Sequence, residues 1–389
     1  MGAIEVLLIF LRLGLTSFGG PIAHLGYFRD AFVTRRKWLS ESDFADLVAL
    51  CQFLPGPSSS QVGFALGVSR AGLLGGLAAW TGFTLPSALL LLAFAQAASS
   101  LKGAVAQAAI HGLKVVAVAV VAQAAWGMAR TLTPDARRAV IAVIAALIVL
   151  FAAGSLAQIA AIAMGAAAGY VFCRQALAVQ AGHLSFPVTR GFGVAMLCLF
   201  GVLLVALPLM ASQSHAVAVF DAFYRSGALV FGGGHVVLPL LRDAVVSKGW
   251  VSPDVFLAGY GAAQAVPGPL FTFATFLGSV LNAPPNNLAG AALALVAIFL
   301  PGILVLLGAL PFWDDFRKRL SAQAVMRGVN AAVVGILAAA LYNPLWTTAI
   351  LGWRDVALAL AGFAALTFLK APPWTVVAGT VVAAVALSL

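Results

Sequence analysis

The stretch FLRLGLTSFGGPIAHLGYFRDAFV, residues 10–33, recurs in changed form as FYRSGALVFGGGHVVLPLLRDAVV at residues 223–246. Both copies keep an Arg-x-Gly, a Phe-Gly-Gly and an Arg-Asp-Ala sequence at an offset of 213 residues. Further along, Gln-x-x-Pro-Gly-Pro at 52–57 recurs at 264–269, at an offset of 212. Arg, Asp, Gln and Pro rarely align by chance in an apolar chain, so the sequence predicts two homologous halves.

The composition predicts a membrane protein. Of the 389 residues, 62% are hydrophobic and 9% are charged, whereas soluble proteins carry about 25% charged residues. Residues 139–173 and 255–313 contain no Asp, Glu, Lys or Arg, and each stretch exceeds the roughly 20 residues that cross a lipid bilayer as a helix. We therefore expect an all-α polytopic membrane protein, which excludes most soluble enzymes. The net charge of +10 is attributed to cytoplasmic loops, so no nucleic-acid partner is expected.

Both halves are predicted to follow one plan. Each begins with a broken apolar segment (4–33; 216–246) and continues with a helix pair split by Pro-Gly-Pro (41–68; 253–280). Long spans follow at about 71–98, 104–131, 137–152 and 156–174, and at about 286–311, 322–342, 354–369 and 373–388, with a short piece near 344–352. We divide the chain into an N-terminal repeat at 1–185, a linker with a connecting span at 186–212 (the linker chain itself runs over 175–190), and a C-terminal repeat at 213–389.

Loop charges favour an inverted repeat. The loop after the first broken segment is richer in Lys and Arg in half one than in half two: it carries Arg29, Arg35, Arg36 and Lys37 in half one, against Arg242 and Lys248 in half two. The loop before the second long span shows the reverse, since Lys102 stands against Arg317, Lys318 and Arg319. By the positive-inside tendency, equivalent loops then face opposite sides of the membrane, provided that each Pro-Gly-Pro pair re-enters. A parallel duplication is the alternative.

The helix breaks mark a candidate site. Backbone groups that are unpaired in lipid are costly, so broken helices persist only where they line a cavity or pack in protein. Proline directly after glycine favours a new helix start at Pro21 and at Pro57. Helix amino termini carry free N–H groups and partial positive charge, which suit an anion. Four such termini are expected near the bilayer midplane; close helix packing is the other explanation for the glycines.

Cations inside the apolar segments point to the same chemistry. Arg12 and Arg225 precede their glycine breaks by two turns or less, and Lys114 lies opposite Arg327 in the repeat. Charge inside a bilayer is rare and usually functional. Alternatively, Arg12 and Arg225 extend to lipid headgroups or pair with Glu5 and Asp221.

The chain lacks the motifs of an energised or metal-dependent enzyme. It contains no GxxxxGK[ST], HExxH or GxSxG sequence, and its three cysteines are far apart. No cofactor and no metal are therefore expected. The remaining classes are a secondary transporter and a channel.

The run from Arg12 to Gly20, its copy from Arg225 to Gly233, Trp38 and Gln52 to Pro57 resemble the sequences of the chromate ion transporter family. The two halves are similar to its long-chain members, in which two homologous domains of opposite orientation lie in one chain. The resemblance implies export of chromate across a bacterial inner membrane, driven by a proton gradient or the membrane potential, and chromate resistance, with sulfate as an isosteric competitor. A transporter or channel for sulfate or molybdate is the alternative. The oligomeric state is left open, a homodimer included.

We assign two sets of candidate residues. Those expected to bind substrate are Arg12, Phe18, Gly19, Gly20, Gln52, Pro55, Gly56, Pro57, Ser58, Ser59, Arg225, Phe231, Gly232, Gly233, His235, Gln264, Pro267, Gly268, Pro269 and Thr272. Those expected on a coupling or ion pathway are Lys114, Arg327, Glu41 and Asp46.

Overall fold

The fold is that of a computed structural model, which describes residues 2–100, 103–152, 155–174, 186–231, 234–313 and 319–388. These residues form helices and no strand. Five helical stretches among them are long and apolar enough to cross a membrane: Ser58–Ala97, Ala104–Leu132, Arg190–Met210, Asn287–Phe312 and Leu320–Ala349. The predicted all-α polytopic architecture is therefore confirmed.

Each half opens with a broken helix, as predicted. In half one, α1 (Ala3–Thr16) stops before Gly19, whose φ of 104° lies in the left-handed region, and α2 (Gly20–Arg29) then runs into the π-helical turn η1 (Asp30–Arg35). In half two, α9 (His215–Ala228) is followed by the short 3₁₀ turn η2 (Gly234–Val236) and α10 (Val237–Val245). At about 1.5 Å per residue, the 14 residues of α1 or α9 span about 21 Å, which is less than the roughly 30 Å hydrocarbon core.

The Pro-Gly-Pro sequences also break the chain where expected. Helix α3 (Glu41–Phe53) precedes the first and α4 (Ser58–Ser100) follows it; α4 bends at Ala71 and Gly72, which have non-helical dihedral angles. Helix α11 (Pro253–Ala263) precedes the second, and η3 (Leu270–Thr272), α12 (Phe273–Ser279) and α13 (Asn287–Ala309, ending in the 3₁₀ turn η4, Leu310–Phe312) follow it. Both Pro-Gly-Pro hairpins thus lead into a long helix.

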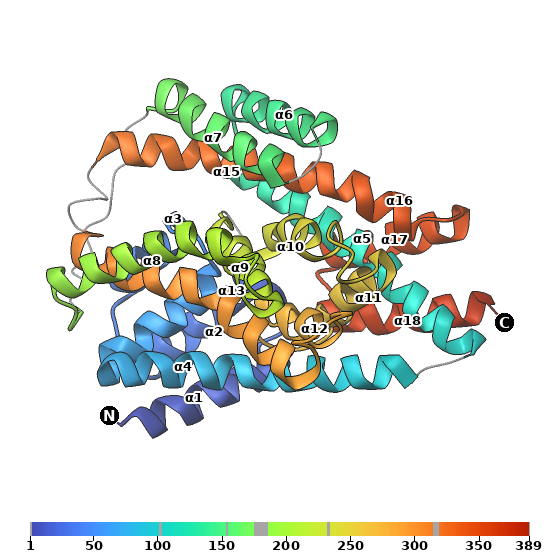
Figure 1. Cartoon of the computed structure of the whole chain (residues 1–389), viewed down its shortest axis with the longest axis horizontal. Helices are drawn as coiled ribbons and strands as arrows, with labels where there is room; N and C mark the ends of the chain where they lie inside the picture. The colour runs from blue at the N-terminus through green and yellow to red at the C-terminus, as the bar shows by residue number, and fades with distance from the viewer. Residues whose placement is uncertain are drawn as a thin grey trace.

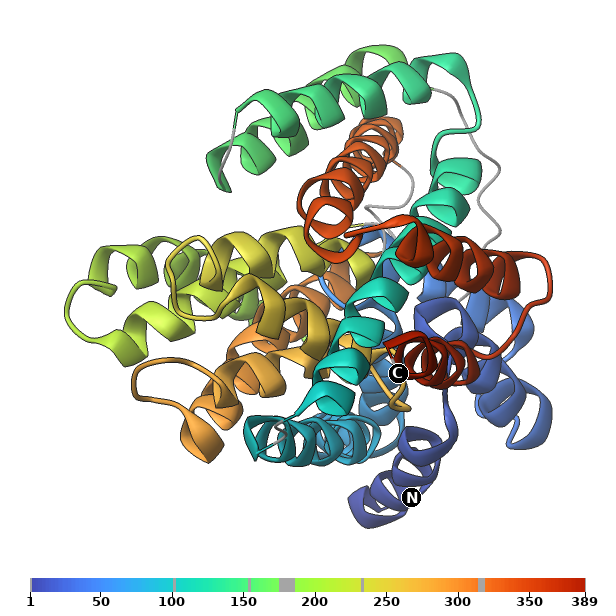
Figure 2. The same ribbon diagram turned by 90° about the vertical axis from the view of Figure 1, so that its right-hand side faces the viewer.

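The last helices of each half pack on the other half. Helices α6 (Ala136–Phe151) and α7 (Ser155–Phe172) cover α15 (Leu320–Ala340), and α17 (Trp353–Thr367) and α18 (Pro373–Ser388) cover α5 (Ala104–Leu132) (Figures 1 and 2). Repeat-related glycines make both contacts close: a Cβ on Gly112 would lie 2.9 Å from Val381 Cα, and one on Gly328 would lie 2.0 Å from Gly165 O. The short π-turn η5 (Leu341–Trp346) and α16 (Thr347–Ala349) join α15 to α17.

Equivalent helices of the two halves run in opposite directions. In Figure 1, α4 runs from left to right and its counterpart α13 from right to left, and α5 and α15 are likewise antiparallel. The connecting helix α8 (Arg190–Met210) lies at the outside, where only 6% of its most apolar window is buried. The two copies of the repeat are therefore inverted with respect to each other. The linker predicted at 175–190 lies mostly outside the described residues.

Candidate functional site

The broken first helix of each half is hydrogen-bonded to the Pro-Gly-Pro turn of the other half. The backbone N–H of Gly56 donates to Val230 O at 2.8 Å, and that of Gly268 donates to Ser17 O at 2.9 Å. Ser17 and Val230 are equivalent in the repeat, as are Gly56 and Gly268. The two bonds are therefore one contact made twice. We call this region the crossing; it comprises residues 17–20, 55–57, 230–231 and 267–269.

Glycine is required at both turns of the crossing. Gly56 has a φ of 116° and Gly268 a φ of 99°, in the region that L side chains rarely adopt. A Cβ on Gly56 would lie 2.9 Å from Gly302 Cα, and a Cβ on Gly268 would lie 2.7 Å from Ser87 Oγ. Gly302 and Ser87 directly follow the helix prolines Pro301 and Pro86. Each turn is thus held against the long helix of the opposite half.

Polar side chains surround the crossing from both halves. Gln61 Nε2 donates to Pro55 O and to Gly302 O, both at 2.9 Å. Thr272 Oγ1 donates to Pro269 O at 2.7 Å, and His235 Nδ1 lies 2.8 Å from the hydroxyl of Tyr260. These bonds fix the turns and orient the imidazole.

The start of α2 lies beside a histidine of the other half. A Cβ on Gly20 would lie 3.8 Å from His235 Nε2. From the same helix, His24 places Nδ1 at 3.4 Å from Ser59 Oγ, next to the amino terminus of α4. The start of α2 and the start of α4 thus contribute to one region together with an imidazole from each half.

Several buried polar atoms near the crossing have no partner among the described residues. They are Ser17 Oγ, Ser60 Oγ, Gln61 Oε1, Thr84 Oγ1 and Thr275 Oγ1. Buried polar groups in native proteins are nearly always hydrogen-bonded to protein, water or a ligand. These atoms therefore mark where a polar ligand or water would bind. None of these residues is among those assigned from the sequence; a single hydroxyl in an apolar run, such as that of Ser17 or Thr84, has no distinguishing pattern.

The predicted arginines lie away from the turns of the crossing. Arg12 is exposed in a recess beside Asp30, and Arg225 pairs with Asp221 in the equivalent place of half two. Gly232 and Gly233 lie outside the described residues. Of the remaining candidates, Phe18 and Phe231 are half-buried, Ser58 and Gln264 likewise, and Gln52 is exposed. Pro57, Ser59, Pro267 and Pro269 are buried.

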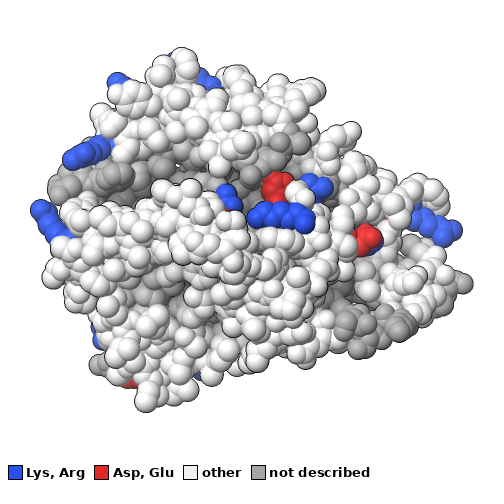
Figure 3. All heavy atoms as spheres, in the orientation of Figure 1, with Lys and Arg blue, Asp and Glu red and all other residues white. Residues whose placement is uncertain are grey.

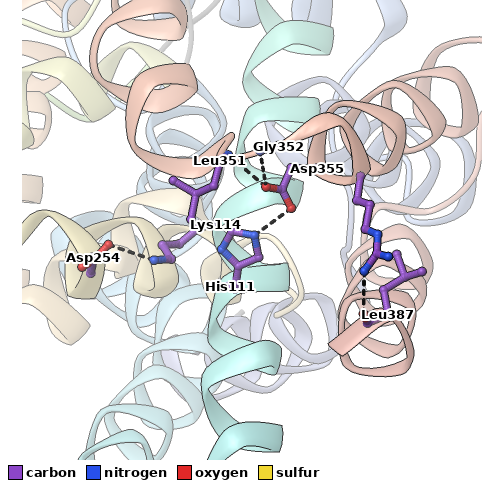
Figure 4. A network of polar contacts seen from close by, with 8 residues as sticks. His111, Lys114, Asp254, Leu351, Gly352, Asp355 and Leu387 are labelled. Atoms are coloured by element: carbon purple, nitrogen blue, oxygen red, sulfur yellow. Dashed lines mark hydrogen bonds and ion pairs between the residues drawn. The ribbon is translucent and has the colours of Figure 1, made fainter. Parts of the chain in front are cut away.

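The candidates for coupling make contacts of their own, apart from the crossing. Lys114 Nζ lies 2.8 Å from Asp254 Oδ1, one turn from the contact between His111 and Asp355 in Figure 4. Arg327 Nη1 donates to Cys173 O at 2.8 Å. Trp313 Nε1 donates to Asp46 at 3.1 Å, and Arg29 Nε lies 2.6 Å from Glu41 Oε1. These cations and acids thus tie helices together, several of them across the two halves.

Charge is scarce on one broad face of the molecule (Figure 3). Figure 3 shows a face that is almost entirely uncharged, with Lys and Arg mostly toward its two ends and one mixed group near the middle. The large uncharged areas of this face fit the hydrocarbon region of a bilayer. The long apolar helices, the inverted repeat and the broken helices that meet between the halves define a multi-pass membrane transporter.

Comparison with known proteins gives the family. A family model described as chromate transporter matches residues 4–170 and again residues 217–386, so the chain belongs to the chromate transporter family. A chromate transport protein of Pseudomonas aeruginosa is 29% identical over 349 residues, covering 87% of this chain and 80% of that protein. A probable chromate transport protein of Synechococcus elongatus is 29% identical over 336 residues, covering 85% and 82%. An uncharacterized transporter of Methanocaldococcus jannaschii is 25% identical over 341 residues, covering 87% and 83%. No solved structure matches the chain.

Proposed function

We propose that this protein exports chromate across a bacterial inner membrane, driven by the proton gradient or the membrane potential, and so confers chromate resistance. The relatives named as chromate transport proteins support the substrate. The observation that carries the site is the reciprocal pair of backbone bonds, Gly56 to Val230 and Gly268 to Ser17. These bonds bring helix starts, glycine turns and unpartnered polar atoms of both halves into one region.

The crossing suits a tetrahedral dianion. The N–H groups at the starts of α2 and α4 supply donors and partial positive charge without a buried counter-ion. Ser17 Oγ and Ser60 Oγ are further hydrogen-bond donors, and neither has a partner among the described residues. Chromate leaves such a site unchanged, because binding needs donors and no electron transfer.

The reciprocal contacts also suggest how the site opens. Inverted repeats allow a transporter to expose one site alternately to the two sides, as one half rocks against the other. Here each half holds the other through the same backbone bond and the same glycine contact. Breaking one copy of the contact while the other holds would open the crossing to one side only.

The residue roles follow from this proposal. The glycines and prolines of the crossing shape the site, and Ser58, Ser59, Thr272 and His235 line it. Arg12 supplies positive charge on the way to it, whereas Arg225 is paired with Asp221. The pathway of the coupling ion is proposed to include Lys114, Arg327, Glu41 and Asp46. None of these roles requires a cofactor.

The test is uptake of radiolabelled chromate into inverted membrane vesicles that carry this protein. We expect accumulation when a proton gradient or a potential is imposed, none after an uncoupler, and competition by sulfate. The variant Ser60→Ala should lower uptake. The variant Ser69→Ala, at an exposed position further along α4, should not. No accumulation under either driving force would refute the proposal, and preferred uptake of sulfate or molybdate would establish the alternative substrate.

A further inference from the structure

A basic recess lies on half one between α1 and the α2–η1 segment. It has a volume of about 220 Å³, and its charged lining is Arg12, Asp30, Arg35 and Arg36. Arg35 Nη2 lies 2.7 Å from Asp30 Oδ2. Arg12 and Arg36 form no ion pair within the described residues. Three arginines against one aspartate leave the recess with two positive charges.

Half two contains a smaller counterpart of this recess. Eight of the nine lining positions of the first recess recur at an offset of 213 residues in the lining of a second one, which includes Arg225, Asp243 and Lys248. The second recess has a volume of about 70 Å³. The repeat therefore contains this feature twice, and the copy in half two is the smaller.

Two substitutions between the copies and one covering side chain distinguish the second recess from the first. Arg225 pairs with Asp221, one turn earlier on α9, but the equivalent position before Arg12 is Leu8. Arg36 is matched by Gly249, which removes one cation from half two. In addition, Gln158 of α7 covers the second recess and donates to Asp243 Oδ2 at 2.9 Å. With Asp221 and Asp243 against Arg225 and Lys248, the second recess carries no net charge.

We propose that the half-one recess binds a tetrahedral dianionic oxyanion through Arg12 and Arg36, and that its half-two counterpart does not. Two net positive charges match a dianion, and guanidinium groups bind oxyanions by paired hydrogen bonds. The inner wall includes Thr16, whose neighbour Ser17 accepts the bond from Gly268 at the crossing. Arg12 lies five residues before Ser17, about 8 Å along the helix. The recess is therefore a loading site beside the proposed central site.

The oxyanion can come from two sources, a free ion from solution or the phosphate of an anionic lipid headgroup. Both present tetrahedral oxygens with negative charge, so the recess chemistry is the same for each. The inference rests on the proposed oxyanion specificity but not on the direction of transport. A local measurement at Arg12 can test it without measuring transport.

The experiment is protection of arginines from phenylglyoxal, with the modified residues identified by mass spectrometry of the purified full-length protein. One arm adds chromate or sulfate to protein in neutral detergent, and another compares nanodiscs of phosphatidylglycerol with nanodiscs of phosphatidylcholine. At about ten times the dissociation constant, an occupied site should slow modification of Arg12 about tenfold. Arg225 of the same molecules is the internal control and should not be protected.

Two variants sharpen the result. Leu8→Asp places on α1 the carboxylate that Asp221 provides on α9, so it should abolish protection of Arg12. Ile4→Asp adds the same charge two turns from Arg12, on the same exposed helix, and should leave protection intact.

The outcomes separate the two proposals. Protection of Arg12 by free chromate or sulfate supports a substrate-loading site, and protection only in anionic nanodiscs supports the same recess as a lipid-phosphate site. Equal protection of Arg12 and Arg225, or protection of neither, overturns the inference. Protection of Arg12 without chromate uptake in vesicles would support the oxyanion site in the recess and refute the proposed export. Chromate uptake without protection of Arg12 would support the proposed export and refute the oxyanion site in the recess.

Discussion

At the scale of single residues, Gly56 makes the sharpest demand on the chain. Its φ of 116° would cost an alanine roughly 1–2 kcal/mol, and a Cβ at 2.9 Å from Gly302 Cα adds an overpacking cost of about 1–3 kcal/mol. We therefore expect Gly56→Ala to lower the stability of the purified protein by about 2–5 kcal/mol and to reduce chromate uptake strongly. Thermal unfolding in detergent and the vesicle assay measure the two effects.

Gly26→Ala is the matched control for this substitution. Gly26 lies in the interior of α2, and a Cβ there would meet no atom within 4 Å. Alanine is the better helix former by about 1 kcal/mol, so the control should be as stable as the native protein or more so. If Gly56→Ala unfolds at the same temperature as the native protein, the first Pro-Gly-Pro turn is not held against Gly302.

The residue scale also shows what the sequence could predict about the site. Gly20 and Gly56 were assigned to it because the proline after each favours the start of a new helix, and both have positive φ in the structure. The bonds to Val230 O and Ser17 O were not predictable, because a backbone carbonyl accepts in the same way whatever side chain it carries. The pair between Arg225 and Asp221 was one of the two readings left open, since their spacing of four residues allows it.

At the scale of helices, a polar network ties α5 to α17. His111 Nε2 lies 2.7 Å from Asp355 Oδ1, while Asp355 Oδ2 accepts from the backbone N–H groups of Leu351 and Gly352 (Figure 4). Burial raises the pKa of Asp355, but the hydrogen bonds from His111 and from these N–H groups outweigh it, so the pKa lies below its ordinary value. The charged carboxylate therefore stabilises the fold.

The sign of this shift gives a pH prediction. A carboxyl whose pKa falls on folding contributes its full stability above the ordinary pKa of about 3.9, and the contribution is lost as the pH falls through the lower native value. We expect Asp355→Asn to lower stability by about 1–3 kcal/mol at pH 7 and to flatten the decline of the thermal midpoint below about pH 4. Glu5→Gln, at an exposed carboxylate on α1, should leave the profile nearly unchanged. If the thermal midpoint of Asp355→Asn depends on pH as that of the native protein does, the polar network does not stabilise α17.

Helix positions were more predictable than helix partners. The span expected at 104–131 is α5 (Ala104–Leu132), because its apolar run ends at charged or turn-forming residues. The packing of α6 and α7 on α15 of the other half could not be predicted from the sequence. Gly165, Gly169 and Gly328 make that contact through their backbones, and small residues allow close approach to any neighbouring helix.

At the scale of the whole molecule, the inversion links loop charge to helix direction. Loop charges favoured opposite faces for equivalent loops, and the antiparallel courses of α4 and α13 in Figure 1 agree. Some of the charges behind the argument, Lys102, Arg317 and Lys318, lie outside the described residues. The direction of the helices therefore supports the inversion independently of those loops.

This inversion predicts opposite sidedness for two exposed lysines. Lys37 follows η1 in half one and Lys248 follows α10 in half two, so single cysteines at these positions should react with a membrane-impermeant maleimide from opposite sides. The richer basic loop places Lys37→Cys in the cytoplasm, where it reacts in inverted vesicles, and Lys248→Cys outside, where it reacts in intact cells. Cys51 and Cys173 are buried and Cys198 is exposed on α8, so all three are first replaced by alanine. A permeant maleimide should label both variants in both preparations and thereby control for access. Labelling of both from one side would establish a parallel arrangement in the membrane, and the reciprocal contacts at the crossing would then need a different explanation.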